Sequence, residues 1–265
     1  MGLYQNRIVV KVGTSTLTNE AGQNDLRSFD RLAWVLSDVH NMGYEIILVS
    51  SGAIAAGTNK LQMKTWPASM RLKQAAAAVG QCSIMFLYDK FFSDYDKTIA
   101  QILLNAEDME VEEKKENLTN TFDSLLEMGI IPVVNENDSV SYTEIESKDR
   151  LFSDNDMLSA VVAVLCRAQK LIILSDIDGF YDSDPRLHPE AKLIERINAI
   201  DEEVQSLAGG AGSRRGRGGM KTKLQAAKLA TSQGIDTVIT NGKKPAALYE
   251  IIKGGNAGTL FAGKR

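Results

Sequence analysis

The sequence predicts an α/β fold, in which a mainly parallel sheet lies between layers of helices. Short apolar runs alternate with helix-length segments along the 265 residues, which is the element order of a parallel sheet. Several of these runs consist of Ile, Val and Leu without alternating polar residues, as expected for strands covered on both faces. Hydrophobic residues make up 44% of the chain and charged residues 24%, values typical of a protein with a sizeable core. We expect residues 1–265 to form a single domain.

Six segments have the composition of strands, and five have apolar residues at helical spacing. The expected strands are residues 7–12, 45–50, 98–103, 130–135, 170–175 and 237–240. The expected helices are residues 25–42, 69–92, 114–128, 155–166 and 220–233. Gly43 follows the first of these helices and is expected to end it. Residues 50–57 form a further strand–turn–helix unit.

Two polar segments interrupt this alternation. Residues 138–150 are expected to form a hairpin or a loop. Residues 209–219 are rich in Gly and Arg and are expected to form a mobile loop. Long loops inside a compact domain are often functional, so both segments are candidates for contact with a ligand.

Composition argues against several classes of protein. A net charge of −4 does not fit a nucleic-acid protein with a broad basic face. Cys82 and Cys166 are far apart and belong to no Cys/His cluster, so we predict neither a metal site nor a disulfide, and we expect both thiols in the core. With two histidines, a Ser/His/Asp triad is poorly supported. No leader or membrane span is recognisable, so a cytoplasmic location is expected.

Small, glycine-containing or polar groups follow four of the expected strands. The four segments are Lys11–Ser15, Ser50–Ala53, Asn135–Asp138 and Ser175–Gly179. Ligands of a parallel sheet bind beyond the carboxyl ends of its strands, so the recurrence predicts a site at this edge.

The first segment combines a cation, a glycine and hydroxyl groups. Gly13 allows the backbone to approach an anion closely, and Lys11 can neutralise charge on a phosphoryl group. A strand that ends in a polar turn with a surface lysine is an equally good interpretation of this segment alone. For Ser50–Ala53, an ordinary tight turn with a capping serine is the better interpretation of the isolated pattern. Asn135–Asp138 has two interpretations: its side chains bind an ammonium or amide group, or the segment is an ordinary turn of the kind that favours Asn and Asp.

Two helix starts also carry charged residues. Asp154 fits an N-cap with Asp156 in the first turn, and the functional alternative is that Asp156 positions lysines while Asn155 binds a substrate. Lys221 and Lys223 stand at a helix start, where the dipole disfavours cations, so a loop that closes over nucleotide phosphates is one interpretation. The other is a solvated surface loop.

Six blocks, in this order, resemble the amino acid kinase family, and within it the branch that phosphorylates the side-chain carboxylate of L-glutamate. They are VVKVGTSTLT at 9–18, LVSSGAIAAG at 48–57, IPVVNEND at 131–138, SDNDMLSA at 153–160, LSDIDGFYDSDPR at 174–186 and GGMKTKLQAAKLA at 218–230. The resemblance implies a three-layer αβα sandwich, with the acceptor site in the N-terminal half and the nucleotide site in the C-terminal half. It also implies Mg²⁺ and ATP, L-glutamyl 5-phosphate as product in proline biosynthesis, proline as feedback inhibitor, and a homo-oligomer (dimer or tetramer). A downstream glutamate-5-semialdehyde dehydrogenase would use the product.

The resemblance also implies residue roles. Lys11, Lys223 and Asp156 would be catalytic, with the carboxylate positioning the two lysines. The acceptor would be bound by Ser51, Gly52, Asn135, Asp138 and Asn155. The nucleotide would be bound by Lys11, Gly13, Thr14, Ser175, Asp176, Gly219, Met220 and Lys223. Ser153 and Arg217 depart from the family pattern, and the chain is expected to be a form without the additional C-terminal domain of many relatives.

Two alternatives remain open at this point. The acceptor could be another acidic amino acid or a carbamate, which competition between acceptors would decide. The chain could instead be a non-catalytic nucleotide- or RNA-binding protein that uses residues 214–217. The set of Lys11, Asp156 and Lys223 argues against that second alternative.

Overall fold

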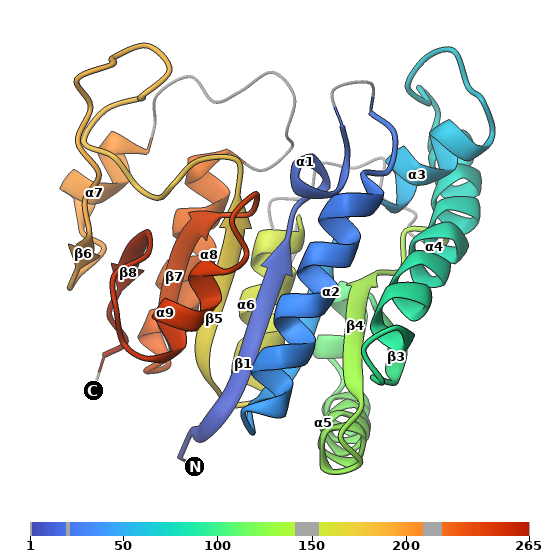
Figure 1. The fold of residues 1–265 in the computed structure, drawn as a ribbon, viewed down its shortest axis with the longest axis horizontal. Helices are drawn as coiled ribbons and strands as arrows, with labels where there is room; N and C mark the ends of the chain where they lie inside the picture. Colours follow the sequence, from blue (N-terminus) through green and yellow to red (C-terminus); the bar gives the residue numbers. More distant parts are fainter. Residues whose placement is uncertain (1, 20–21, 141–153, 209–218, 265) are drawn as a thin grey trace.

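The computed structural model describes residues 2–19, 22–140, 154–208 and 219–264. Within them, eight strands form one sheet with helices on both faces (Figure 1). The strands are β1 (Tyr4–Val12), β2 (Glu45–Ser50), β3 (Ile99–Leu104), β4 (Ile131–Glu136), β5 (Ala168–Ser175), β6 (Arg196–Ile197), β7 (Asp236–Asn241) and β8 (Thr259–Phe261). Their order across the sheet is β3-β4-β2-β1-β5-β7-β8-β6.

The predicted mainly parallel sheet is confirmed. All neighbouring strands pair in parallel except β7 and β8, which are antiparallel. All six expected strands are present, and β1 begins three residues earlier than expected. Strands β6 and β8 were missed because they have two and three residues, too few to show a pattern.

The helices also follow the prediction closely. They are α1 (Thr14–Leu17), α2 (Leu26–Asn41), α3 (Ala53–Lys60), α4 (Met70–Ser93), α5 (Glu112–Glu127), α6 (Asn155–Leu165), α7 (Glu202–Leu207), α8 (Met220–Ser232) and α9 (Ala247–Ile252), with a 3₁₀ turn η1 (Ala106–Met109). Gly43 follows α2 with a φ of +92°, which confirms its role at the helix end. The missed elements α1, η1, α7 and α9 have four to six residues each, too short for a helical period to be visible.

Two apolar cores, one on each face of the sheet, make this a three-layer sandwich. Helices α2, α4 and α9 pack on one face, and α5, α6 and α8 pack on the other. Figure 1 shows α2 and α9 in front of the sheet and α6 and α8 behind it. Side chains of a strand alternate between faces, so Val10 of β1 belongs to the first core and Val9 to the second. Lys11 has the parity of Val9 and therefore faces the α6–α8 layer.

Helices α3 and α4 cross in direct backbone contact. A Cβ atom added at Gly57 would overlap the carbonyl oxygen of Ala76, and one added at Gly80 would overlap the carbonyl oxygen of Ala53. Both positions thus require glycine. The close crossing fixes α4 relative to the turn that follows β2.

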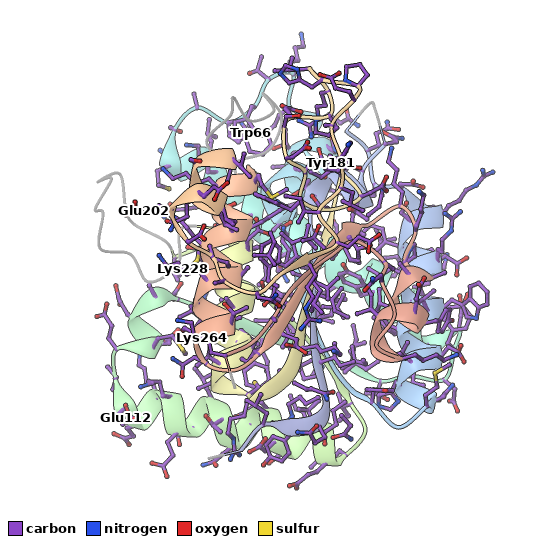
Figure 2. All side chains as sticks on the ribbon, turned by 90° about the vertical axis from the view of Figure 1, so that its left-hand side faces the viewer. Trp66, Glu112, Tyr181, Glu202, Lys228 and Lys264 are labelled. Atoms are coloured by element: carbon purple, nitrogen blue, oxygen red, sulfur yellow. The ribbon has the colours of Figure 1, made fainter. Side chains whose placement is uncertain are left out.

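Glu112 of α5 and Lys228 of α8 are exposed charged residues on the helices that cover one face of the sheet (Figure 2). Cys166 is buried as expected. The expectation that Cys82 lies in the core is wrong, because Cys82 is on the exposed face of α4. In the described parts of the chain, no helix is both long and apolar enough to cross a membrane.

Some predictions fall on residues that the structure does not describe. The expected loops at 138–150 and 209–219 lie mostly outside the described residues. Ser153 and the 214–217 segment lie wholly outside them.

Candidate active site

The four strands with polar groups at their ends are neighbours in the sheet, in the order β4-β2-β1-β5. Val12 of β1 pairs with Ser50 of β2 on one side and with Leu174 of β5 on the other. Val49 of β2 pairs with Val134 of β4. The carboxyl ends of all four strands therefore meet at one edge, which is the upper edge in Figure 1. The structure brings the four segments together, as the sequence predicted.

A buried pair of lysines shares one carboxylate at this edge. Lys11 Nζ of β1 lies 2.7 Å from Asp156 Oδ1 of α6, and Lys223 Nζ of α8 lies 3.0 Å from Asp156 Oδ2. The exposed fraction is 1% for Asp156 and 7% for each lysine. We call Lys11, Asp156 and Lys223 the Lys–Asp–Lys bridge.

The charges of the bridge do not cancel. Burial alone would raise the pKa of Asp156, but attraction and hydrogen bonding by Lys11 and Lys223 lower this pKa below its ordinary value. The carboxylate therefore stays ionised and neutralises one lysine. Its two ammonium groups and one carboxylate give the bridge one net positive charge, which suits an anion arriving from solvent, and Asp154 also interacts electrostatically with Lys11 and Asp156.

The start of α6 determines where Asp156 lies. Asp154 is the N-cap, and its side chain accepts hydrogen bonds from the backbone N–H of Asp156 at 2.8 Å and of Met157 at 3.0 Å. The predicted N-cap is thus confirmed. Burial and the charge of Asp156 raise the pKa of Asp154. Its Oδ2 atom is buried and accepts no hydrogen bond from the described residues.

The start of α8 adds donors to the same place. Gly219 is the N-cap and supplies no side chain, and the first turn contains no acidic residue. Thr222 Oγ1 lies 3.0 Å from both Asp156 Oδ2 and the Gly219 carbonyl oxygen, and its single hydrogen serves one of them at a time. Sequence reasoning missed Thr222, although its position beside Lys223 was a signal. The N–H groups at the start of this 13-residue helix suit a phosphate.

An amide network lies on the β4 side of the bridge. Asn155 Nδ2 donates to the Ser50 carbonyl oxygen at 3.0 Å and to Asn135 Oδ1 at 2.9 Å. Asn135 Nδ2 in turn donates to Gln81 Oε1 of α4 at 2.9 Å. The structure therefore joins the predicted pair of Asn135 and Asn155. It adds Gln81, which no sequence pattern identified.

The turns after β1 and β2 contact each other. Ser51 Oγ donates to the Val12 carbonyl oxygen at 3.2 Å and lies 3.3 Å from Thr14 Oγ1. Gly52 has a φ of +102°, a conformation that favours glycine, and a Cβ there would lie 3.4 Å from the Thr14 side chain. A Cβ on Gly13 would lie 3.4 Å from Lys11 Nζ, so the absence of a side chain at Gly13 leaves space beside the bridge.

The turn after β5 is more exposed. Ser175 Oγ donates to Asp176 Oδ1 at 3.2 Å, and Asp176 Oδ2 lies 2.9 Å from Arg186. Asp138 is half-buried two residues beyond β4, and Met220 is the first residue of α8. Their places in a binding site stay predictions.

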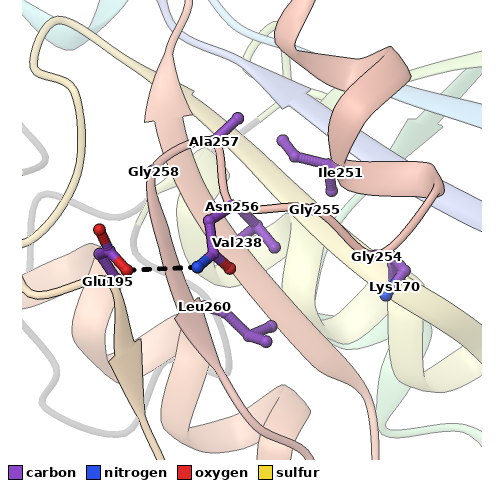
Figure 3. Close-up of a pocket in the computed structure, with 10 residues that line it drawn as sticks. All are labelled: Lys170, Glu195, Val238, Ile251, Gly254, Gly255, Asn256, Ala257, Gly258 and Leu260. Atoms are coloured by element: carbon purple, nitrogen blue, oxygen red, sulfur yellow. Dashed lines mark hydrogen bonds between the residues drawn. The ribbon is translucent and has the colours of Figure 1, made fainter.

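A separate small cavity lies among β5, β7 and the turn between α9 and β8 (Figure 3). Asn256 Nδ2 donates to Glu195 Oε2 at 3.2 Å there. The volume of the cavity is about 30 Å³, which is enough for a water molecule and far too small for a nucleotide. Lys170 lines it five residues before the site-forming end of β5, so we assign it no part in the site.

Fold and site together define a class of protein, and comparison with known sequences gives its name. The amino acid kinase family matches residues 6–241, and the chain belongs to this family. The following two solved structures are among those that share the fold. Carbamate kinase from Giardia lamblia bound to AMP-PNP aligns with a TM-score of 0.69 at 15% identity, covering 98% of each chain. UMP kinase from Bacillus anthracis aligns with a TM-score of 0.66 at 13% identity, covering 98% of this chain and 97% of that one.

Relatives of much higher identity carry one particular name. Glutamate 5-kinase of Clostridium perfringens is 54% identical over 259 residues, which cover 98% of this chain and 96% of that protein. Glutamate 5-kinase of Listeria monocytogenes (serovar 1/2a) is 49% identical and covers 98% and 94%, respectively. The predicted resemblance is therefore confirmed, and within the family the chain falls among the glutamate 5-kinases.

Proposed function

We propose that the protein transfers the γ-phosphoryl group of ATP to the side-chain carboxylate of L-glutamate. The product is L-glutamyl 5-phosphate, and the reaction is the first step of proline biosynthesis. The Lys–Asp–Lys bridge at the carboxyl ends of the central strands is the observation that carries the proposal. The names of the relatives at 54% and 49% identity support the choice of acceptor.

The geometry suits phosphoryl transfer to a carboxylate. Such a transfer needs alignment and charge neutralisation more than covalent help. A carboxylate acceptor is already ionised near neutral pH, so no general base is required. We assign Lys11 and Lys223 to the transferring phosphoryl group. Asp156 holds both ammonium groups in place, and its lowered pKa fits a positioning charge rather than a proton acceptor.

The nucleotide side of the proposal uses β1, β5 and α8. The N–H groups beside Gly219 and Met220 are suited to bind phosphate, and Gly13 and Thr14 line the turn next to Lys11. Ser175 and Asp176 would border the rest of ATP. Mg²⁺ in nucleotide sites is commonly held by substrate phosphates together with one or two carboxylates. When bound, it would neutralise phosphate charge.

The acceptor side uses the opposite flank of the bridge. Ser51 and Gly52 line the turn after β2, and Asn135 and Asn155 form the amide network beside it. We place L-glutamate here, with Asp138 as a further ligand beyond β4.

A panel of acceptors tests the reaction. ADP release from Mg-ATP is measured with L-glutamate, L-aspartate, N-acetylglutamate and carbamate. The proposal predicts turnover with L-glutamate at least about tenfold above any other acceptor, because a site built for one set of polar groups rejects analogues. Turnover with another acceptor instead would keep the class and change the substrate. Absence of turnover, together with salt-sensitive RNA binding, would favour a binding protein.

Further parts of the proposal rest on the resemblance alone. Proline would act as feedback inhibitor, and the protein would be a cytoplasmic homo-oligomer, a dimer or tetramer, that supplies a glutamate-5-semialdehyde dehydrogenase. Glutamate-dependent turnover at rising proline concentrations, and the molar mass in solution, measure the first two directly.

A further inference from the structure

A chain of three side-chain amides runs from the end of β2 to helix α4. We propose that Gln81 of α4 is a positioning residue, which fixes the amide orientation of Asn135 and Asn155 and thereby determines which atom Asn155 offers to the acceptor. This inference rests on the proposed function, in which Asn155 contacts the acceptor amino acid. Gln81 itself acts through the other two residues.

The orientation of Asn155 follows from a single backbone atom. The carbonyl oxygen of Ser50 can only accept a hydrogen bond, so Asn155 must turn its Nδ2 toward that oxygen, at 3.0 Å. The second N–H of the same amide donates to Asn135 Oδ1 at 2.9 Å. Both donors of Asn155 are then used. Its remaining polar atom is Oδ1, which can only accept.

The orientation of Asn135 follows from that of Asn155. Because Asn135 turns its Oδ1 toward Asn155, its Nδ2 points to α4, where Gln81 Oε1 accepts at 2.9 Å. Asn135 is only 4% exposed, so water is a poor substitute for this acceptor. Without Gln81 Oε1, Asn135 either leaves an N–H unpaired or flips its amide. The flipped amide would set N–H against N–H and displace Asn155.

The fold holds Gln81 firmly in this place. Its neighbour Gly80 packs directly on the backbone of Ala53, the first residue of α3. Gly52 precedes α3 and follows the end of β2, which carries the Ser50 carbonyl group. The same helix crossing therefore fixes both ends of the amide chain relative to each other.

The polarity of the amide chain matches one group of the acceptor. The remaining Oδ1 of Asn155, an acceptor, suits the α-ammonium group of an amino acid, which has only donors. An Asn155 with reversed orientation would present N–H groups instead and repel that ammonium. Gln81 would thus contribute to binding of the acceptor and leave ATP binding untouched.

Charged replacements of Gln81 separate this effect from simple electrostatics. Gln81→Glu keeps an acceptor for Asn135 and adds a negative charge, whereas Gln81→Lys offers only donors and adds a positive charge. If charge alone mattered, the lysine variant would bind anionic glutamate better. The amide chain predicts the reverse. We expect the KM for L-glutamate to rise about tenfold in Gln81→Lys and in Gln81→Met. In Gln81→Glu it should stay within about threefold of the wild-type value. The KM for ATP should be unchanged in all three variants.

A double-mutant cycle tests whether Gln81 acts through Asn155. In an Asn155→Ala background, Gln81→Met should change kcat/KM for glutamate by less than about twofold, because the group it orients is gone. Gln225→Met, on the exposed face of α8, is the matched control and should behave like wild type. Three results would overturn the inference. They are a glutamate KM at wild-type level in Gln81→Met, a lower glutamate KM in Gln81→Lys than in Gln81→Glu, and an equal loss of kcat/KM when Gln81→Met is made in the wild-type and in the Asn155→Ala background. An inactive wild-type protein would overturn the proposed function instead.

Discussion

At the scale of single residues, the site depends on the balance of buried charge. Asp156 is almost fully buried and bonds both lysines, so each residue of the bridge depends on the other two. Removing a lysine takes away a charge that is already oriented before the reaction starts. Preorganised charges of this kind are usually the largest contribution to catalysis.

Lys11→Ala and Lys223→Ala should each lower kcat by roughly 100-fold or more, as expected for the loss of one preorganised charge-stabilising group. Steady-state ADP release measures the effect. Lys228→Ala is the matched control, because Lys228 lies on α8 like Lys223 but is exposed (Figure 2). Near wild-type turnover in either bridge variant would remove that lysine from the mechanism.

Asp156 also predicts a pH dependence of stability. Its pKa is lowered in the folded protein, whereas an unfolded Asp titrates near pH 4. The stabilisation is therefore present above about pH 4 and is lost as the pH falls through the folded-state pKa. We expect urea midpoints to drop more between pH 7 and low pH for wild type than for Asp156→Asn. Other acidic groups titrate in both proteins, so the difference between the two curves is the readout, and parallel curves would contradict the prediction.

Asp138→Ala tests the acceptor side. We expect the variant to raise the KM for glutamate several-fold while the KM for ATP changes little, because Asp138 is assigned to the acceptor and not to the nucleotide. Initial rates at varied concentrations of both substrates give the two constants. An unchanged glutamate KM would remove Asp138 from the acceptor site.

The residue scale also shows what sequence can and cannot predict. Lys11, Asp156 and Lys223 were identifiable because charged groups stood at strand ends and helix starts, where parallel-sheet ligands bind. Gln81 was not identifiable, since its partners lie 54 residues away and beyond, and only the crossing of α3 and α4 brings them together. Gln81 is a polar residue in the middle of a long helix, and nothing in its local pattern separates it from a surface position. Thr222 was also missed, although it stands next to Lys223 in the first turn of α8.

At the scale of elements, strand parity and helix crossings build the site. Lys11 faces α6 and α8 because side chains alternate along β1, and the paired helices bring Asp156 and Lys223 to it. Strands β1, β2, β4 and β5 were predictable because they are rich in Ile, Val and Leu and are largely buried in the middle of the sheet. Strands β6 and β8 and the four-residue helix α1 lacked the length to show a period, so only packing reveals them.

The crossing of α3 and α4 gives a prediction at this scale. Gly80→Ala places a methyl group into the Ala53 carbonyl group and should destabilise the protein by at least about 2 kcal/mol. By moving Gln81, it should also raise the KM for glutamate. Urea unfolding and substrate kinetics give the two values. Ala78→Met, on the exposed face of α4, is the control, and wild-type stability of Gly80→Ala would show that the crossing is not as tight as described.

At the scale of the whole molecule, the two ends of the central strands differ in function. The carboxyl ends of the strands hold the candidate site. Toward the amino-terminal ends of the strands, Arg7 donates to Glu45 at 2.7 Å, to Asp123 at 2.7 Å and to the Cys166 carbonyl oxygen at 2.9 Å. Arg7 thus ties β1 to β2, α5 and the end of α6.

Arg7→Met should therefore reduce stability without changing the chemistry. The variant leaves two partly buried carboxylates and one carbonyl group without their partner, which should cost about 2 to 4 kcal/mol of unfolding free energy. Activity per folded molecule, with both KM values, should stay close to wild type. Thermal unfolding measures the stability, and kinetics at temperatures below the unfolding transition measure the activity. A rise of only one KM at unchanged stability would contradict the assignment of Arg7 to stability alone.

The central claim is that the phosphoryl group passes from ATP to the γ-carboxylate of glutamate. Hydroxylamine converts an acyl phosphate into a hydroxamate, so the purified protein should be incubated with Mg-ATP, L-glutamate and hydroxylamine. The account predicts γ-glutamyl hydroxamate in step with ADP, both dependent on glutamate and both lost in Lys223→Ala. ADP without hydroxamate, or hydroxamate formed on a different acceptor, would contradict it.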